Sequence, residues 1–185
     1  MAEHFNVALL PLDENLECAC VDFAQANFAA QASEYLLGSL ALPHVTLCQF
    51  EFEGGRDQVH SVWVALKNLQ SMRIHLNFRY MYIKAGAAIH EGKYWIGLAV
   101  EPNERLSALQ KTVYEKLHDL KIEGKTLPQS YFPHLTMARC DNDKPPRLAS
   151  LPPNEIWMTD YFFSVSLGIS DENGVYRERL YSALG

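Results

Sequence analysis

The sequence predicts an α+β fold in which antiparallel strands outnumber helices. Three segments carry apolar residues at the three-then-four spacing of half-buried helices. Several other segments alternate apolar and polar residues, as strands with one buried face do. The last two of these are joined by Asp171-Glu172-Asn173-Gly174, a composition typical of a hairpin turn. Together these observations favour an antiparallel sheet with helices over the parallel sheet of α/β proteins.

The individual elements follow from the same patterns. Asp13 and Asn103 precede two of the helical segments and are suitable N-caps, because their short side chains can accept hydrogen bonds from the first free backbone N–H groups. The predicted helices cover residues 13–31, 57–70 and 103–120. The predicted strands cover residues 4–10, 45–52, 73–82, 94–100, 135–140, 156–170 and 175–181.

Length and composition indicate one globular domain over residues 1–185. Apolar residues make up 48% of the chain and charged residues 21%, as in ordinary folded proteins. The longest stretch without a charge, residues 35–50, is too short and too polar to cross a bilayer, so no membrane partner is expected. The N-terminus shows no basic and apolar signal segment, which favours a cytoplasmic protein. The four cysteines are scattered and are expected to be reduced thiols.

The charge balance restricts the partners. A net charge of −6 argues against binding of long duplex nucleic acid, which would need a basic surface. A small nucleotide or an RNA terminus in a local pocket is compatible with this charge, and so is a monomer. The chain has no glycine-rich phosphate loop and no Gly-x-Ser-x-Gly motif, so nucleoside triphosphate hydrolysis and serine hydrolase chemistry are poorly supported.

An internal repeat is the most informative feature. The segment Pro43-His44-Val45-Thr46-Leu47 recurs as Pro133-His134-Leu135-Thr136-Met137, an offset of 90 residues. The same offset relates the strand segment 7–10 to 97–100 and the first predicted helix to the third. Each half thus reads as strand, capped helix, loop and a strand that opens Pro-His-x-Thr. We expect two pseudo-symmetric lobes, each an antiparallel sheet with helices packed outside, and an active-site cleft between them.

The repeated motif carries acid–base chemistry. Residues two apart on a strand point to the same side, so His44 and Thr46 share a face, and so do His134 and Thr136. Two imidazoles across one cleft can act as base and acid, because one ring is neutral while the other is cationic near pH 6.5. Phosphoryl transfer needs these groups on opposite sides of phosphorus, and threonine hydroxyls can donate to its non-bridging oxygens. This scheme needs no metal and no cofactor.

These motifs, their spacing and the chain length resemble the 2H phosphoesterase superfamily, which includes the 2′-5′ RNA ligase and 2′,3′-cyclic phosphodiesterase proteins. The resemblance covers nearly the whole chain. It implies a two-lobed α+β fold with a cleft between antiparallel sheets. It also implies that His44, Thr46, His134 and Thr136 act without metal on 2′,3′-cyclic phosphates or 2′-5′ linkages. The implied substrate is a nucleotide or an RNA terminus, and the implied activity is that of a phosphodiesterase.

Two further residues are candidates for substrate binding. The second motif continues into Ala138-Arg139, as is common in the RNA-ligase branch, so the resemblance assigns Arg139 to the substrate's charge. Strict alternation turns Arg139 away from the motif's histidine and threonine unless a β-bulge re-aims it. The first copy reads Cys48-Gln49 instead and offers no basic partner. Tyr131 precedes the second motif and is a candidate to stack on a base.

Three other interpretations stay open. The fold can serve as a non-catalytic module that binds an RNA end or a nucleotide, with the motifs as phosphate ligands only. The histidines can be ligands of a metal-dependent hydrolase, although no carboxylates stand beside the motifs. The third interpretation is a purely structural duplication that binds no ligand, since a single His-x-Thr on a strand is usually structural.

Overall fold

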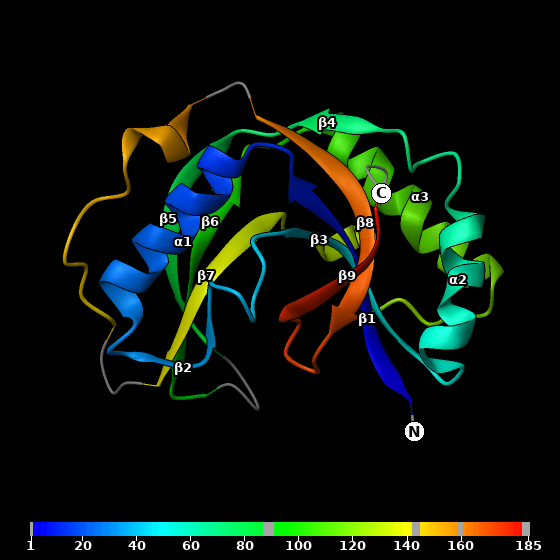
Figure 1. Cartoon of the computed structure of the whole chain (residues 1–185), viewed down its shortest axis with the longest axis horizontal. Coiled ribbons are helices and arrows are strands. Elements are labelled where there is room, and N and C mark those ends of the chain that lie inside the picture. The colour runs from blue at the N-terminus through cyan, green and yellow to red at the C-terminus, as the bar shows by residue number, and fades with distance from the viewer. Residues whose placement is uncertain (1, 87–90, 142–144, 159–160, 183–185) are drawn as a thin grey trace.

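The computed structural model describes residues 2–86, 91–141, 145–158 and 161–182 (Figure 1). Its α-helices are α1 (Glu14–Phe28), α2 (Gly55–Ala65) and α3 (Glu104–Asp119). Its strands are β1 (Glu3–Pro11), β2 (Ala32–Leu36), β3 (Val45–Phe52), β4 (Arg73–His75), β5 (Phe78–Ala85), β6 (Lys93–Val100), β7 (His134–Asp141), β8 (Phe162–Ser170) and β9 (Tyr176–Ser182). Short 3-10 helices η2 (Pro128–Ser130) and η3 (Asn154–Trp157) complete the order.

The described strands form one sheet of nine strands, in which every pair is antiparallel. The main path is β4-β8-β1-β3-β7-β6-β5, with β2 beside β7 and β9 beside β8. The α+β class with antiparallel strands is therefore confirmed. We call β1, β3, β4, β8 and β9 the β3 half, and β2, β5, β6 and β7 the β7 half.

The two halves meet where the motifs begin. A single Cα pair, Val45 with Leu135, joins β3 to β7. Each of these residues stands between the histidine and the threonine of its motif. The lobes are thus continuous through one point of a shared sheet, rather than separate sheets, and their two-fold symmetry stays a prediction. This junction places the two His-x-Thr motifs side by side.

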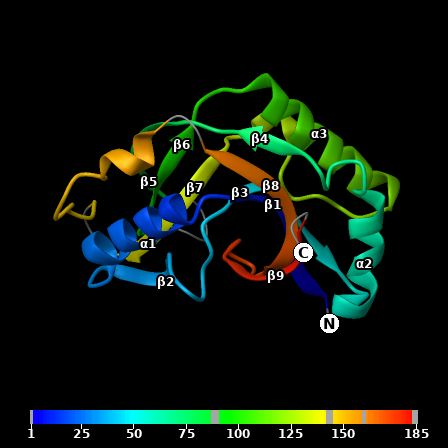
Figure 2. The same cartoon turned by 45° about the horizontal axis from the view of Figure 1, so that its top comes forward.

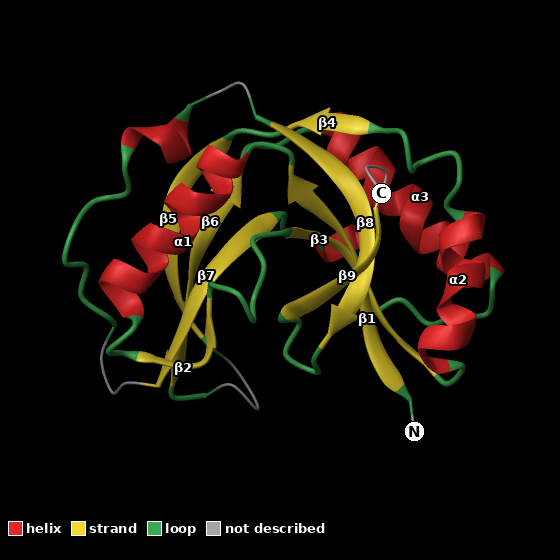
Figure 3. Cartoon of the chain, in the orientation of Figure 1, coloured by secondary structure: helices red, strands yellow, loops and turns green. Residues whose placement is uncertain are grey.

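The helices cover the outer sides of the sheet, and two of them cross between the halves. Strand β1 belongs to the β3 half, but α1, which follows it, packs on β7. Strand β6 belongs to the β7 half, but α3 packs on β3. Figure 2 and Figure 3 show α1 and α3 on opposite outer sides with the strands between them. The inner faces of the halves are therefore left uncovered by helices.

The predicted N-caps are confirmed. The Asp13 carboxylate accepts hydrogen bonds from the backbone N–H groups of Asn15 and Leu16. The Asn103 amide oxygen accepts from Arg105 and Leu106. Both caps satisfy donors of the first turn that have no partner inside the helix.

Both motif strands contain a β-bulge just after the threonine. The register passes from Ala8–Thr46 to Val7–Cys48 in one ladder, and from Gly97–Thr136 to Ile96–Ala138 in the other. Leu47 and Met137 are the extra residues, and both are fully buried. Because a bulge shifts the alternation by one residue, the side chains beyond it change face. Ala8 and Gly97, the partners of the two motif threonines, are 89 residues apart. This offset is one less than the 90 residues that the sequence repeat predicts.

Several element boundaries differ from the sequence prediction. The predicted strand 73–82 is two strands, because the chain leaves β8 after His75 and joins β6 from Phe78. The segment 156–170 begins with η3 after two prolines, and its strand starts only at Phe162. Helix α2 ends at Ala65 instead of residue 70.

Strand β2 was not predicted, and one predicted loop is only partly visible. Ala32–Leu36 shows no regular alternation, and Glu34 within it has a positive φ of 62°. The segment 141–146, whose Asp, Asn and Pro residues predict a surface loop, lies partly outside the described residues. No helix in the described part of the chain is both long and apolar enough to span a membrane.

Candidate active site

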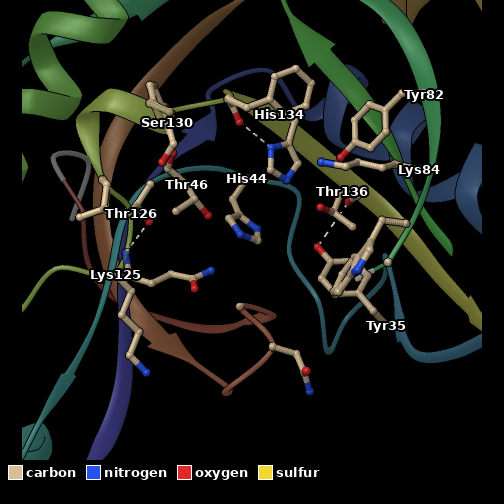
Figure 4. Close-up of a pocket in the computed structure, with 18 of the residues that line it drawn as sticks. Tyr35, His44, Thr46, Tyr82, Lys84, Lys125, Thr126, Ser130, His134 and Thr136 are labelled. Atoms are coloured by element: carbon tan, nitrogen blue, oxygen red, sulfur yellow. Dashed lines mark hydrogen bonds between the residues drawn. The ribbon is translucent and has the colours of Figure 1, made fainter. Parts of the chain in front are cut away.

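A cavity of about 590 Å³ opens at the junction of the two halves (Figure 4). Five of the six predicted site residues line it, namely His44, Thr46, Tyr131, His134 and Thr136. The other lining residues are Tyr35, Gln49, Tyr82, Lys84, Ala85, Gly86, Trp95, Lys125, Thr126, Leu127, Ser130, Phe132, Asn173 and Gly174. No carboxylate is among these described residues, so the cavity offers donors and cations to an anionic ligand.

The two histidines are held in the same way. The Nδ1 atom of His44 lies 2.8 Å from the carbonyl oxygen of Leu42, and Nδ1 of His134 lies 2.7 Å from that of Phe132. A carbonyl oxygen only accepts, so Nδ1 carries the proton and donates it in both rings. Nε2 is then the nitrogen of each ring that remains for exchanging a proton.

Burial makes both rings harder to protonate. The His44 side chain is only 5% exposed, and its burial lowers its pKa from 6.5 to about 4, against the opposing effect of the hydrogen bond to Leu42. The pKa of His134 is also lowered, chiefly by burial and further by the positive charge of Lys84. Both rings are therefore neutral in the empty cavity near pH 7. A bound anion favours their protonated forms, because opposite charge raises the pKa of an imidazole.

The two threonine hydroxyls have different partners. The Oγ1 atom of Thr46 accepts a hydrogen bond of 3.0 Å from the buried amide of Asn6. Its own proton is therefore available to a ligand. The Thr136 side chain is hydrogen bonded to the Tyr82 phenol instead. Both hydroxyls lie on the wall of the cavity, as the motif spacing predicts.

Tyr82 reaches Thr136 across a glycine. Gly97 pairs with Tyr82 on β5 and with Thr136 on β7. A Cβ atom at Gly97 would lie 2.6 Å from the Leu135 carbonyl oxygen and 2.7 Å from the Tyr82 hydroxyl. The absence of a side chain at this position therefore makes room for the phenol in the cavity wall.

Arg139 is the predicted site residue that the structure does not bring to the cavity wall. Beyond the bulge it faces the same side as its strand partners Trp95 and Tyr35, which do line the cavity. Its side chain is fully buried, forms an ion pair with Glu34, and places its guanidinium 5.2 Å from the centre of the Trp95 ring. In this structure Arg139 therefore packs over the Trp95 ring and does not line the cavity.

The first motif copy shows the opposite arrangement. Gln49 stands 90 residues before Arg139, where the sequence offered no basic partner, and Gln49 does line the cavity. Two hydrogen bonds hold its backbone. The Gln49 N–H group donates to Thr126 Oγ1 at 3.3 Å, and the Lys125 N–H group donates to the Gln49 carbonyl oxygen at 2.7 Å. The wall formed by the β3 half is therefore neutral and polar at this position.

An aromatic wall formed by Tyr35, Tyr82, Trp95 and Phe132 lies on the β7 half. The sequence pattern beside the second motif also makes Phe132 a candidate to stack on a base, but sequence reasoning missed the other three. Tyr35 and Trp95 meet edge to face at 6.2 Å, Tyr82 and Phe132 do so at 5.7 Å, and Phe132 stacks on His134 at 5.4 Å. The alternation through Tyr80 and Tyr82 indicates a strand with one buried face, but it does not show that Tyr82 faces a cavity. Trp95 begins a predicted strand, where packing in the core is the more common role.

Lys84 was missed as well. It pairs with Trp95 in the β5–β6 register and therefore lies on the same face of the sheet. Figure 4 shows its side chain extending toward His134, while Lys125 lies on the other side of the cavity. Lys125 pairs with Glu51, whereas Lys84 forms no ion pair with any described carboxylate. Lys84 is thus the cation of the cavity wall that is available to a ligand.

Comparisons with known proteins agree with this architecture. No family model and no curated protein matches the chain. Among solved structures, the chain is similar to one described as a phosphoesterase, with a TM-score of 0.61 at 13% identity, covering 98% of this chain and 97% of that one. A structure described as the MHV ns2 PDE domain matches with a TM-score of 0.45 at 16% identity, covering 88% of this chain and 98% of that one. The fold expected from the sequence resemblance is confirmed, since over nearly its whole length the chain has the fold of a phosphoesterase.

Proposed function

We propose that the chain is a metal-independent phosphodiesterase of the 2H type. Its substrate class is a 2′,3′-cyclic phosphate or a 2′-5′ linkage on a nucleotide or an RNA terminus. The observation that carries the proposal is the convergence of two His-x-Thr motifs on one cavity, each with its imidazole Nδ1 held by a backbone carbonyl. The fold shared with a phosphoesterase supports it independently.

The proposed reaction uses the Nε2 atoms of the two rings. One neutral imidazole takes a proton from the attacking water as the new oxygen–phosphorus bond forms. The other imidazole, protonated in the presence of the anionic substrate, gives its proton to the ribose oxygen whose bond to phosphorus breaks. The hydroxyls of Thr46 and Thr136 donate to the non-bridging oxygens as negative charge develops on them.

The walls of the cavity favour a nucleoside ester over a simple phosphate ester. The aromatic rings of the β7 half offer faces on which a base can stack. On the opposite wall, Gln49 and Asn173 supply carboxamides and Thr126 and Ser130 supply hydroxyls. These groups can bond a ribose or the edge of a base without adding charge. Lys84 supplies the positive charge that two neutral histidines lack.

A turnover assay tests this function. The four nucleoside 2′,3′-cyclic monophosphates and a 2′-5′-linked dinucleotide are each incubated with the protein in the presence of EDTA. The expected result is hydrolysis of at least one substrate, lost in the variant that carries both His44→Ala and His134→Ala. The matched control is His118→Ala, because His118 is exposed on α3 and remote from the cavity lining.

The outcomes separate the open alternatives. Activity that survives in the double variant contradicts the proposal, and so does activity that EDTA abolishes. Tight binding of these ligands without turnover, measured in parallel by calorimetry, indicates the non-catalytic nucleotide-binding module instead.

A further inference from the structure

The junction between β3 and β7 leaves the two motif threonines at gaps in the strand pairing. One edge of β7 meets β3 at Leu135 and then meets β2 from Ala138 onward. One edge of β3 meets β7 at Val45 and next forms a bridge from Phe50 to Gly124. Thr46 and Thr136 therefore lie where each strand passes from one neighbour to the next. A backbone carbonyl at such a position needs a partner from outside the ladder.

Two tyrosine hydroxyls supply those partners. The Tyr35 hydroxyl donates to the Thr136 carbonyl oxygen at 3.3 Å. The Tyr131 hydroxyl donates to the Thr46 carbonyl oxygen at 2.9 Å. Each tyrosine belongs to the sequence half of one motif and bonds to the threonine of the other. The dashed line between Tyr35 and Thr136 is visible in Figure 4.

Both hydroxyls are fixed as donors. The Tyr35 side chain is 3% exposed, and its ring packs edge to face on Trp95. Tyr131 packs against the hydrophobic core. Burial raises the pKa of both phenols well above their usual range, so both hydroxyls keep their protons near neutral pH. This also assigns Tyr131 a contact that the base-stacking prediction did not include.

We propose that Tyr35 and Tyr131 are reciprocal positioning residues, whose crossed hydrogen bonds set the separation and orientation of the two His-x-Thr motifs. This inference rests on the proposed function, because it concerns the spacing that the reaction requires. A threonine carbonyl cannot shift without moving its own hydroxyl and the histidine two residues before it. The crossed bonds therefore tie both acid–base groups to one frame.

The need for such a device follows from the fold. The sheet ladder joins the halves by one Cα pair, so the ladder alone does not fix their relative orientation. Base and acid must reach opposite sides of one phosphorus atom, and a misplacement of about 1 Å can reduce a rate by roughly 100-fold. The Tyr131–Thr46 bond links the segment before β7 to β3, and the Tyr35–Thr136 bond links β2, which leads to the first motif, to β7. Each bond therefore ties the chain that leads into one motif to the other motif.

The test removes one oxygen atom at a time. The variants are Tyr35→Phe, Tyr131→Phe and both together, assayed on the substrate that the wild type turns over best. The matched control is Tyr161→Phe, because the buried Tyr161 hydroxyl also donates to a backbone carbonyl, that of Glu155 at 2.7 Å, but lies outside the cavity lining. We expect kcat to fall about 10-fold in each single variant and by more than the product of the two in the double variant, with KM changed less than about 3-fold. Each bond alone still ties the chain before one motif to the other motif, which is why losing both costs more.

A second readout does not depend on activity. Amide hydrogen exchange is measured at residues 45–47 and 135–137 by NMR or mass spectrometry. We expect faster exchange at both segments in each tyrosine variant and no change there in Tyr161→Phe. If the tyrosine variants have the same kcat and the same exchange rates as Tyr161→Phe, the positioning role is overturned. Turnover by the wild type would in that case still support the proposed function. If the wild type turns over no substrate, the proposed function fails. The positioning role is then tested by exchange alone, and unchanged exchange in the tyrosine variants overturns it.

Discussion

The two copies of the motif share a backbone plan but stand in different surroundings. In the β3 half, His44 is almost fully buried, packs its ring 5.2 Å from that of Tyr176, and faces a carboxamide wall with Gln49. In the β7 half, His134 is half-buried, stacks on Phe132 and lies near the charge of Lys84. The repeated motif thus places two similar imidazoles in the cavity, and their neighbours make them unequal. Pairs of titratable groups in unequal environments are a common basis for separate acid and base roles.

The largest expected effect comes from removing either ring. His44→Ala and His134→Ala should each lower kcat/KM by about 100-fold to 10,000-fold, because each removes one proton transfer. Steady-state kinetics on the best cyclic phosphate or 2′-5′-linked substrate measures this. An intact rate in either variant would show that the copies do not share the chemistry.

The threonines give the next largest effect and separate the copies further. Thr46→Val and Thr136→Val should each lower kcat by about 10-fold to 1000-fold, as the loss of one oxyanion donor does. Serine at either position keeps the hydroxyl and should restore most of the rate. The variant pair is compared by kcat at saturating substrate, and equal rates for valine and serine would remove the hydroxyl from the mechanism.

The burial of His44 predicts a pH dependence of folding. Its pKa is about 4 in the folded chain and 6.5 without burial, so the unfolded chain takes up the proton first as pH falls. Stability is therefore lost between pH 6.5 and 4, by about 3 kcal/mol from this ring alone. Urea unfolding across this range measures the loss. His44→Gln should flatten the curve and the exposed His118→Gln should not, so an equal slope in all three proteins would contradict the burial effect.

A smaller effect distinguishes the two strands that pair with the bulged motif strands. Gly97→Ala places a Cβ atom against the Leu135 carbonyl, which cannot move aside, and should cost about 1–3 kcal/mol and displace Tyr82. Ala8→Gly, at the corresponding position of the β3 half, should cost only about 0.5–1 kcal/mol of backbone entropy, plus one lost buried methyl group. Unfolding free energies measure both, and an Ala8→Gly cost above that of Gly97→Ala would contradict the close packing at Gly97.

The smallest expected effect concerns the free cation. Lys84→Met should raise KM about 10-fold, about the value of one charged hydrogen bond, while Lys84→Arg keeps most of the affinity. Lys125→Met is the matched control, because its charge is already paired with Glu51. Initial rates at two salt concentrations measure the difference. Equal KM values for the two methionine variants would mean that Lys84 does not contact the substrate.

Much of this architecture was readable from residue patterns. The capped helices, most strands, the antiparallel class and the repeated motif all follow from spacing of two and of three to four residues. The four motif side chains share a cavity because spacing within a strand also fixes the face. Tyr131 reaches the same cavity, although its hydroxyl contacts the Thr46 carbonyl.

The remaining features depend on contacts that local patterns do not encode. The bulges at Leu47 and Met137 shift the alternation by one residue, and no local signal marks them. They turn both Gln49 and Arg139 to the cavity side of the sheet, where Gln49 lines the cavity while Arg139 packs against Trp95 and pairs with Glu34 instead. Tyr35 stands on a strand that sequence periodicity did not reveal.

The central claim is that the two motifs form one site, and a comparison of rates tests it most directly. The variant that lacks both His44 and His134 is compared with each single alanine variant, on one substrate and with EDTA present. When two residues act as one unit, substitution of either removes nearly all of the rate enhancement that they provide together. The double variant should therefore be no more than about 10-fold slower than the slower single variant. A double variant slower by the full product of the two single losses would mean that the histidines act independently, and would contradict the shared site.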